Sequence, residues 1–592
     1  MTAQFQSFDA STNPADGGPR LAALRAEMVR AGVDAFIVPR ADAHQGEYVA
    51  ASDARLAWLT GFTGSAGFAV VTADRAGVFI DGRYRVQVRA ETDPAHFTPV
   101  NWPETQPADW LAEALPKGAK VGFDPWLHTV AQVEALRKRG IELVAVDNLV
   151  DAVWPDRPAP PVGAVRLHPD DLAGETAAEK RARIARALRE AGQGAAVLTL
   201  PDSISWLLNI RGRDLPRNPV VQGFALIHDD ARVDLFTDPA KFDDATRAAL
   251  GNEVTIHPPH AFAPALTALK GVVRLDPASA PQAVADLLQA DIARGDDPCV
   301  MPKAIKNPSE IKGMRAAHLR DGAVMVRLLA WLDAQPSESL TEIDVVRQLE
   351  ALRREAGAYD ISFDTICGAG PNGAIVHYRV TEGTNRGVAR DDVLLIDSGG
   401  QYADGTTDIT RTVAIGTPPD EARAAFTRVL QGMIAMSLLR FPKGLAGRDI
   451  DAVARAPLWM AGQDYDHGTG HGVGAALCVH EGPARLSRIS DVALAEGMIL
   501  SNEPGYYREG AFGIRIENLI VVTRARAEPG REMLGFETLT FAPIDRRMID
   551  ADALSWAERD WLNDYHAATF AQLSPMLDGD ALDWLTRATA PL

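Results

Sequence analysis

Four acidic residues in the second half of the chain stand at or inside segments whose apolar pattern predicts buried β-strands. They are Asp397, Asp408, Glu503 and Glu517. Aspartate is a poor strand residue, so an acid at the end of an apolar strand such as Val393–Ile396 needs an explanation. Adjacent carboxylates repel one another unless a proton or a metal lies between them, and burying four charges without compensation is prohibitive. If these acids converge, the fold must gather them around cations.

A glycine-rich stretch, His467-Gly-Thr-Gly-His-Gly-Val-Gly474, places two histidines four residues apart, and His480 follows it. One imidazole would complete a ligand set with the four acids. His471 is the best candidate, because its flanking glycines allow the backbone and a metal to approach closely. Four oxygen-donor residues and one nitrogen donor suit Mn²⁺ or Co²⁺, with Zn²⁺ as a further alternative. Two such ions roughly 3.5 Å apart hold a bridging hydroxide, which is a nucleophile at neutral pH.

The competing interpretation of these acids is a solvated turn or strand end. For any single acid that interpretation is the more common one. The same strand-end pattern at every position would require several coincidences, so the sequence favours a site with two divalent metal ions.

The composition restricts the class of protein. A chain of 592 residues is too long for one core and predicts two to four domains. Its net charge of −19 argues against a nucleic-acid or anionic-membrane partner. The N-terminal segment shows no pattern of a signal peptide, and no apolar run is long enough to span a bilayer. Three widely separated cysteines fit a reducing compartment, so we expect a cytoplasmic protein.

The order of predicted elements divides the chain into three parts. Residues 1–160 are predicted to form an α/β domain, and a proline-rich segment at 154–165 is typical of a linker. A similar order of elements recurs in residues 161–307. The phrases "DARLAWLTGF" and "DSISWLLNI" stand at equivalent places in the two parts, which indicates an old duplication.

Residues 308–592 form the third predicted part. Pro308 begins a long helix, Thr341 caps another, and glycine-rich strands carrying many acids and histidines follow from about residue 360. The segment 555–573 is predicted to be a terminal helix whose aromatic and leucine positions suit docking. The predicted fold class is therefore multidomain, with two α/β domains followed by an α+β domain that carries the chemistry.

Six motifs in this last part, in order along the chain, resemble the "pita-bread" metallopeptidases of family M24. They are "IDSGGQY", "TTDITRT", "HGTGHGVG", "VHEGP", "SNEPGYY" and "GIRIENL". The chain is most similar to the long, cytosolic type of Xaa-Pro aminopeptidase. The resemblance extends to two creatinase-like N-terminal domains, through "DGRY" and "ISWLLNIRGRDLPRNPV", and to a C-terminal extension.

The resemblance implies a role for each matching residue. The implied metal ligands are Asp397, Asp408, His471, Glu503 and Glu517. Asp397 would bind one ion, Asp408 and Glu517 would bridge, and His471 and Glu503 would hold the other. Glu503 would also act as the base, and His377 and His480 would act on the substrate. The residues expected to bind substrate are Arg83, His377, His467, His480 and Arg515, and Arg515 could alternatively orient Glu517 by a charged hydrogen bond.

The implied activity is hydrolysis of the bond between an N-terminal residue and a following proline, by a hydroxide held between two metal ions, most simply Mn²⁺. The resemblance and the aromatic C-terminal segment also imply a homodimer formed through the C-terminal domain. Prolidase, which cleaves Xaa-Pro dipeptides only, is the alternative within the fold, and the extra domains favour the longer substrate. Methionine aminopeptidase would not need the N-terminal half, and creatinase would not retain five ligands.

Two alternatives come from outside this enzyme group. One is a catalytically inactive pita-bread module that binds peptides, although such a module has no need of five costly polar groups in its core. The other is a dinuclear phosphoesterase, which the ligand pattern and the lack of a basic phosphate clamp disfavour.

Overall fold

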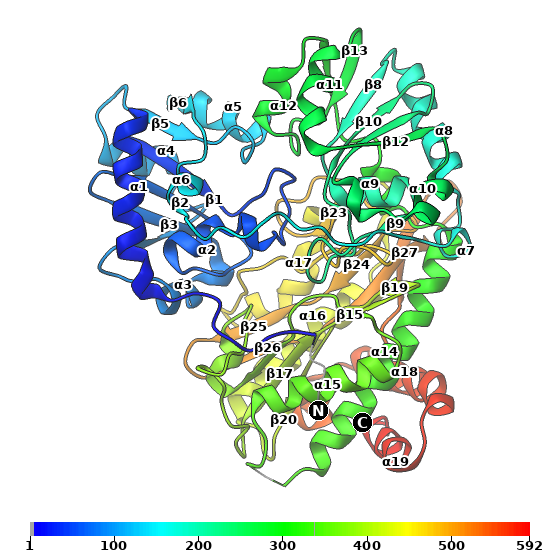
Figure 1. The fold of residues 1–592 in the computed structure, drawn as a ribbon. Helices are drawn as coiled ribbons and strands as arrows, with labels where there is room; N and C mark the ends of the chain where they lie inside the picture. Colours follow the sequence, from blue (N-terminus) through cyan, green and yellow to red (C-terminus); the bar gives the residue numbers. More distant parts are fainter. Residues whose placement is uncertain (1–4, 337) are drawn as a thin grey trace. The chain divides into compact units, whose positions relative to one another are not determined.

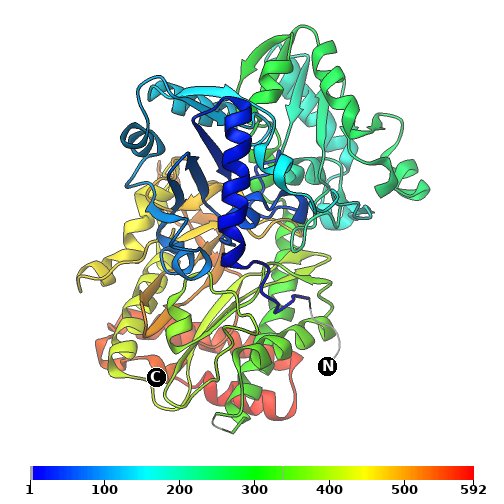
Figure 2. The ribbon, with the colours of Figure 1, turned by 60° about the vertical axis from the view of Figure 1, so that its left-hand side comes forward.

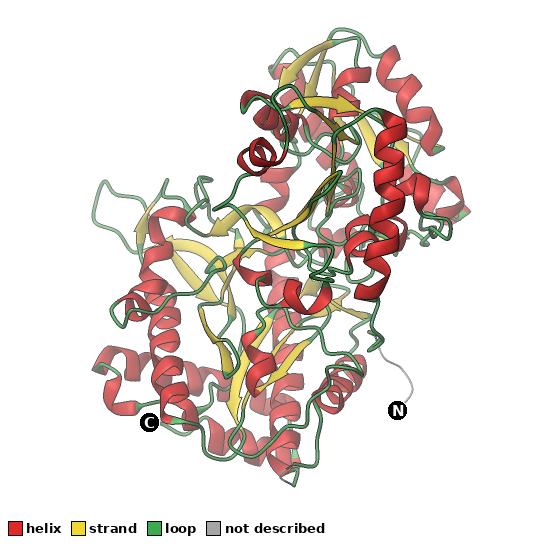
Figure 3. Cartoon of the chain, turned by 90° about the vertical axis from the view of Figure 1, so that its left-hand side faces the viewer, coloured by secondary structure: helices red, strands yellow, loops and turns green. Residues whose placement is uncertain are grey.

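The computed structural model describes residues 5–336 and 338–592, which divide into two compact units. One unit comprises residues 11–300. The other comprises residues 301–592 together with the N-terminal segment through Ala10. Both units contain helices and strands (Figure 3). None of the helices in the described part of the chain combines the length and apolar character needed to span a bilayer.

Two six-stranded sheets with the same topology form the frame of residues 11–300 (Figure 1). The order of the first is β4 (Thr98–Asn101), β3 (Ala76–Ile80), β2 (Phe68–Thr72), β1 (Ala35–Pro39), β5 (Lys120–Phe123), β6 (Glu142–Ala145). The order of the second is β12 (Val254–His257), β11 (Val233–Phe236), β10 (Phe224–His228), β8 (Ala195–Leu198), β13 (Val272–Leu275), β14 (Asp291–Arg294). In each sheet the first strand of the sequence pairs with one antiparallel and one parallel neighbour. This shared topology confirms the prediction of two similar α/β domains.

Amphipathic helices cover these sheets. Helix α1 (Gly17–Ala31) buries Leu21, Leu24 and Met28 in one cluster with Phe36 of β1, and it runs beside the first sheet (Figure 2). Helix α8 (Ala177–Glu190) occupies the equivalent place before β8 and begins with a capping box of Thr176 and Glu179. The two similar segments, "DARLAWLTGF" and "DSISWLLNI", contribute to equivalent short helices, α2 (Arg55–Thr60) and α9 (Pro201–Leu207).

The unit of residues 301–592 contains two sheets that carry the predicted ligands. The larger has the order β21 (Phe441–Pro442), β28 (Met533–Thr538), β27 (Asn518–Ala525), β24 (Ile499–Asn502), β22 (Gly470–Gly472), β23 (Glu481–Leu486). The smaller has the order β16 (Ile366–Ala369), β17 (Val393–Ser398), β20 (Ile409–Ala414). Strands β15 (Asp360–Ile361), β18 (Gly400–Tyr402) and β19 (Gly405–Thr406) form a third sheet, and β25 (Gly505–Arg508) pairs with β26 (Phe512–Arg515).

Long helices frame these sheets. They are α14 (Pro308–Ala334), α15 (Glu342–Glu355), α16 (Asp420–Leu438) and α17 (Gly447–Trp459). Helix α14 begins at Pro308 with a capping box of Asn307 and Glu310, and Thr341 caps α15, as the sequence predicts.

The structure corrects two predictions about individual elements. The apolar segment around Glu517, expected to form a buried strand, is interrupted at Ile516 and Glu517, between β26 and β27. Arg515 and Glu517 therefore do not lie on one continuous strand. The predicted terminal helix is α18 (Trp556–Leu573), and a separate helix, α19 (Gly579–Ala588), follows it.

Candidate metal centre

Strand pairing brings the four acids together from distant parts of the chain. In the pairing of β17 with β20, Asp397 lies opposite Thr410, and Asp408 directly precedes β20. The hydroxyl of Thr410 donates a hydrogen bond of 2.7 Å to Oε2 of Glu517. In the larger sheet, Asn502 pairs with Asn518, so the neighbouring Glu503 and Glu517 are held at the same end of two adjacent strands.

The Nε2 atom of the His471 ring faces two of these acids. Its Nε2 atom lies 3.4 Å from Oδ2 of Asp408 and 3.5 Å from Oε1 of Glu503. Its Nδ1 atom lies 2.9 Å from the carbonyl oxygen of Gly472. Since a carbonyl oxygen can only accept, Nδ1 carries the proton and the lone pair of Nε2 points at the acids. One ligand atom each from Asp408, His471 and Glu517 lie within 4.8 Å of one another.

The electrostatics of the cluster call for added positive charge, from protons or from cations. Burial, followed by the charge of Asp397, raises the pKa of Asp408 well above its usual value. Burial and the charges of Asp408 and Glu503 do the same to the pKa of Glu517. Burial raises the pKa of Glu503 to about 7, although His471 and Arg515 oppose the shift. These shifts mean that the acids cannot all remain ionised side by side without added positive charge.

Three carboxylate oxygens at the centre of the cluster are buried and have no hydrogen-bond partner among the described residues. They are Oδ1 of Asp397, Oδ1 of Asp408 and Oε1 of Glu517. Buried carboxylate oxygens of this kind are normally paired or bound to metal. The donor set of four carboxylates and one imidazole therefore fits divalent cations.

Arg515 contacts the cluster differently from the hypothesis drawn from the sequence. Its Nη2 atom donates to Oδ2 of Asp397 at 2.5 Å, while the direct hydrogen bond to Glu517 comes from Thr410. Its Nη1 atom donates to the hydroxyl of Tyr507 at 2.5 Å. That hydroxyl lies 2.9 Å from Nε2 of His467, whose Nδ1 faces the carbonyl oxygen of Gly468. A continuous path of hydrogen bonds thus joins His467 to Asp397.

Of the other residues predicted to bind substrate, His480 and His377 lie in the same unit as the cluster, and Arg83 lies in the unit of residues 11–300. The ring of His480 lies edge-on to that of His471, with ring centroids 4.2 Å apart. His377 is half-buried and follows Val376, whose carbonyl oxygen accepts a hydrogen bond of 3.4 Å from Arg515. Arg83 belongs to the other unit, where it pairs with Asp81 at 2.7 Å.

The glycines of the histidine segment have a reason that the sequence analysis did not recognise. A Cβ atom on Gly470 would lie 1.9 Å from the carbonyl oxygen of Ser501, and one on Gly472 would lie 2.2 Å from that of Glu481. Close packing of β22 against its neighbours therefore excludes side chains at these positions. The expectation that glycine leaves room for ligand does not explain these two positions.

Several residues that support the site were missed in the sequence. Arg455 of α17 donates to the carbonyl oxygen of His467, and its partner Asp451 accepts from Thr469 at 2.6 Å. Tyr507 lies within the quoted motif "SNEPGYY", so its position four residues after Glu503 was visible. Arg455 and Asp451 sit on an ordinary amphipathic helix, and only the tertiary structure reveals their contacts.

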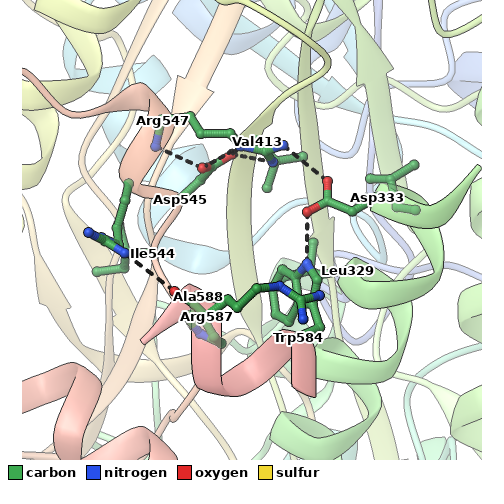
Figure 4. Close-up of a pocket in the computed structure, with 12 residues that line it drawn as sticks. Leu329, Asp333, Val413, Ile544, Asp545, Arg547, Trp584, Arg587 and Ala588 are labelled. Atoms are coloured by element: carbon green, nitrogen blue, oxygen red, sulfur yellow. Dashed lines mark hydrogen bonds and ion pairs between the residues drawn. The ribbon is translucent and has the colours of Figure 1, made fainter. Parts of the chain in front are cut away.

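A pocket of about 270 Å³ lies elsewhere in the same unit and contains none of the predicted site residues (Figure 4). It is lined by residues of α14, β20, α19 and the segment 543–547. The acids in its wall already have partners, because Asp545 pairs with Arg547, and Asp333 accepts from Trp584 and pairs with Arg547.

Comparison with known families agrees with the three-part organisation. Residues 20–153 and 156–310 match two families described as creatinase/prolidase N-terminal domains. Residues 312–524 match metallopeptidase family M24, and residues 532–592 match the C-terminal region of peptidase M24.

Relatives cover nearly the whole chain. A probable Xaa-Pro aminopeptidase P of Laccaria bicolor is 41% identical over 97% of this chain and 93% of its own length. Aminopeptidase P2 of Arabidopsis thaliana is 40% identical over 95% and 86%. Among solved structures, an X-prolyl aminopeptidase of Caenorhabditis elegans, described as a cytosolic enzyme with a di-nuclear active site, matches 97% of this chain and 100% of its own with a TM-score of 0.93 and 34% identity. An Xaa-Pro dipeptidase of Bacillus anthracis matches 62% of this chain with a TM-score of 0.52 and 28% identity. The chain therefore belongs to metallopeptidase family M24, together with the Xaa-Pro aminopeptidase P proteins that it matches along almost its whole length.

Proposed function

We propose that this protein is a metal-dependent aminopeptidase that hydrolyses the bond between an N-terminal residue and a following proline. The observation that carries the proposal is the gathering of Asp397, Asp408, Glu503 and Glu517 in one cluster beside His471, whose Nε2 atom lies 3.4 Å from Asp408 and 3.5 Å from Glu503. The membership of family M24 and the full-length match to aminopeptidase P relatives support the same activity.

The residues that would hold two divalent cations are Asp397, Asp408, His471, Glu503 and Glu517. When bound, such cations lower the pKa of water and polarise a carbonyl oxygen. Arg515 donates to Asp397 and Thr410 donates to Glu517, and these hydrogen bonds orient the two carboxylates.

The protein's own groups would move the protons. Glu503 would accept the proton of the attacking water and return it to the proline nitrogen as the peptide bond breaks. The proline nitrogen must gain this proton to leave as an amine, as the nitrogen of any hydrolysed peptide bond does. His480, beside His471, would donate a hydrogen bond to the scissile carbonyl oxygen as it gains charge. His377, His467 and Arg83 would bind the peptide around this centre.

Prolidase is the less favoured assignment. The match to the Xaa-Pro dipeptidase covers only 62% of this chain, whereas the match to the X-prolyl aminopeptidase covers 97%. An inactive peptide-binding module is also less favoured. Burying carboxylate oxygens without hydrogen-bond partners among the described residues costs free energy, and a module that binds no metal gains nothing in return.

We propose Mn²⁺ as the metal, because carboxylate-rich sites favour the harder divalent ions, with Co²⁺ and Zn²⁺ as the alternatives. We also propose that the protein acts in the cytoplasm, as the Caenorhabditis elegans relative is described to do. Metal analysis of protein purified without added metal and fractionation of cells test these two points.

We further propose a homodimer formed through the C-terminal domain. The apolar side chains exposed on this unit support it, since Trp556 at the start of α18 is 85% exposed and Met460 is 91% exposed. Exposed apolar side chains that form a contiguous patch are typical of surfaces that bind a partner. Sedimentation at micromolar concentration tests this point, and a monomer would contradict it.

The decisive experiment removes the metal. The protein is stripped with EDTA, and release of the N-terminal residue from Arg-Pro-Pro is followed before and after adding Mn²⁺. We expect activity to vanish on stripping and to return with two equivalents of Mn²⁺. Activity that persists in fully stripped protein would contradict the proposal, and cleavage of Arg-Pro but not of Arg-Pro-Pro would favour prolidase.

A further inference from the structure

A buried ion pair lies behind the strands that carry two of the proposed ligands. Nε of Arg353, on α15, lies 2.9 Å from Oδ1 of Asp321, on α14, and Nη2 lies 3.0 Å from Oδ2. The two side chains are 0% and 3% exposed. Burying such a pair costs desolvation energy that its attraction often fails to repay, so stability alone does not explain its presence.

The arginine side of the pair reaches the residue beside Asp397. Nη2 of Arg353 donates a hydrogen bond of 3.1 Å to the hydroxyl of Ser398. Ser398 is the last residue of β17 and directly follows Asp397. The pair therefore fixes the end of the strand from which the Asp397 carboxylate projects.

The aspartate side of the pair reaches the residue beside Asp408. The hydroxyl of Thr407 donates a hydrogen bond of 2.9 Å to Oδ2 of Asp321, and the same hydroxyl accepts from the backbone N–H of Gly400 at 2.9 Å. Thr407 directly precedes Asp408. A single ion pair is thus bonded to the neighbours of two proposed ligands, one at the end of β17 and the other in the segment between β19 and β20.

Arg353 also interacts electrostatically with Asp408. Burial alone would lower the pKa of the Arg353 guanidinium, but Asp321, then Tyr402 and Asp408, raise it above its usual value. Nη1 of Arg353 is buried and has no hydrogen-bond partner among the described residues. The guanidinium therefore stays charged, and its field reaches Asp408.

We propose that Arg353 and Asp321 are positioning residues that set the affinity of the centre for divalent cations, by fixing the backbone beside Asp397 and Asp408. The inference rests on the proposed function, because it presumes that these two acids bind metal. Its physical basis is that groups behind a ligand typically change metal affinity or activity by about 10- to 100-fold when they are removed.

The test measures metal binding directly. Metal-free wild type, Arg353→Met and Arg353→Lys are titrated with Mn²⁺ by calorimetry, and the stoichiometry is checked by elemental analysis. We expect Arg353→Met to bind Mn²⁺ about 10- to 100-fold more weakly. Arg353→Lys keeps the charge but lacks the planar fork that bonds Asp321 and Ser398 together, so its affinity should be intermediate. At saturating Mn²⁺ the KM for Arg-Pro-Pro should change less than kcat.

Arg55→Met is the matched control. Arg55 is also buried and is held by aspartates, with Nε 2.6 Å from Oδ1 of Asp151, but it lies in the unit of residues 11–300. It should lose stability and keep the wild-type Mn²⁺ affinity. An equal loss of affinity in Arg55→Met would attribute the effect to general destabilisation and overturn the inference.

Milder variants decide the matter if Arg353→Met does not fold. Thr407→Val and Ser398→Ala each remove one hydroxyl from the contacts and leave the ion pair in place. Weaker Mn²⁺ binding in these folded variants supports the inference, and wild-type affinity in both overturns it. If wild-type protein itself binds no Mn²⁺, the proposed function fails as well. If it binds two equivalents and the Arg353 variants match it, only the positioning role fails.

Discussion

His471 and Glu503 are joined through one intervening hydroxyl. The backbone N–H of His471 donates to Oγ of Ser501 at 2.9 Å, and that hydroxyl donates to Oε1 of Glu503 at 3.0 Å. The same Oε1 atom lies 3.5 Å from Nε2 of His471. Ser501 therefore fixes β22 and the end of β24 so that imidazole and carboxylate face a common point.

Asp408→Asn should abolish most activity by weakening metal binding. The amide keeps the size of the carboxylate but loses its charge. Removing even a group that only supports a ligand lowers metal affinity or activity by about 10- to 100-fold, and Asp408 is itself a proposed ligand. We expect a loss of more than about 100-fold in kcat/KM and less than two bound equivalents of Mn²⁺. Asp404→Asn, in the neighbouring turn where Asp404 pairs with Arg320, is the control and should keep both. Full metal content with full activity in Asp408→Asn would contradict the assignment.

His480→Ala should lower kcat by about 100-fold or more while the metal content stays unchanged. The reason is that His480 lies beside the ligand His471 but is expected to hydrogen-bond the carbonyl oxygen of the substrate. Steady-state kinetics with parallel elemental analysis separate the two roles. Loss of metal from this variant would instead identify His480 as a ligand or as a support for His471.

Tyr507→Phe should reduce activity by about tenfold, because it removes one hydrogen bond to a charged group. The ring remains, but the hydroxyl that connects Arg515 to His467 is removed. We expect retained metal, unchanged folding and a lower kcat/KM for Arg-Pro-Pro. Tyr506→Phe, at the adjacent position of β25, is the matched control. Equal effects of the two substitutions would show that the hydroxyl of Tyr507 has no specific role.

Arg83→Ala tests whether the N-terminal domain contributes to substrate binding. Arg83 is held by Asp81 through two bonds, from Nε at 2.9 Å and from Nη2 at 2.7 Å, so its side chain is oriented before any peptide binds. We expect a KM raised by about tenfold with little change in kcat, as for a group that binds ground state and transition state alike. An unchanged KM would leave Arg83 a structural residue of its own domain.

Acidification should destabilise the protein partly through His566. Burial, followed by the charges of Arg411 and Arg546, lowers the pKa of His566 to about 4, and its Nε2 atom accepts from the backbone N–H of Ile544. Between the unfolded and folded pKa values only the unfolded chain binds the proton, so this contribution is lost as the pH falls from about 6.5 toward 4. From about pH 7.5 to about pH 5 the cost is about 2 kcal/mol.

His566→Gln removes this titration and keeps an acceptor for Ile544. Urea unfolding of wild type and variant at both pH values measures the difference. The stability of the variant should fall less on acidification than that of wild type. Parallel losses in the two proteins would show that His566 does not contribute.

Local patterns in the sequence were enough to predict much of the fold. The Asn307–Glu310 and Thr341–Asp344 capping boxes begin their helices where the sequence places them, because capping depends on residues only a few positions apart. The repeated order of elements likewise predicted two similar α/β domains, and their two sheets share one topology. Acids at the ends of apolar strands signalled a buried charged centre, since the cost of burying charge is independent of the fold.

Only the tertiary structure decided which groups meet. Arg515 bonds Asp397 instead of Glu517, because the strand breaks at Ile516 and Glu517 and β17 lies within reach of the arginine. The roles of Ser501, Tyr507 and the Arg353–Asp321 pair were equally out of reach, as each depends on contacts between segments far apart in the chain. Periodicity determines which side of an element is buried, whereas the packing of whole elements determines what that side touches.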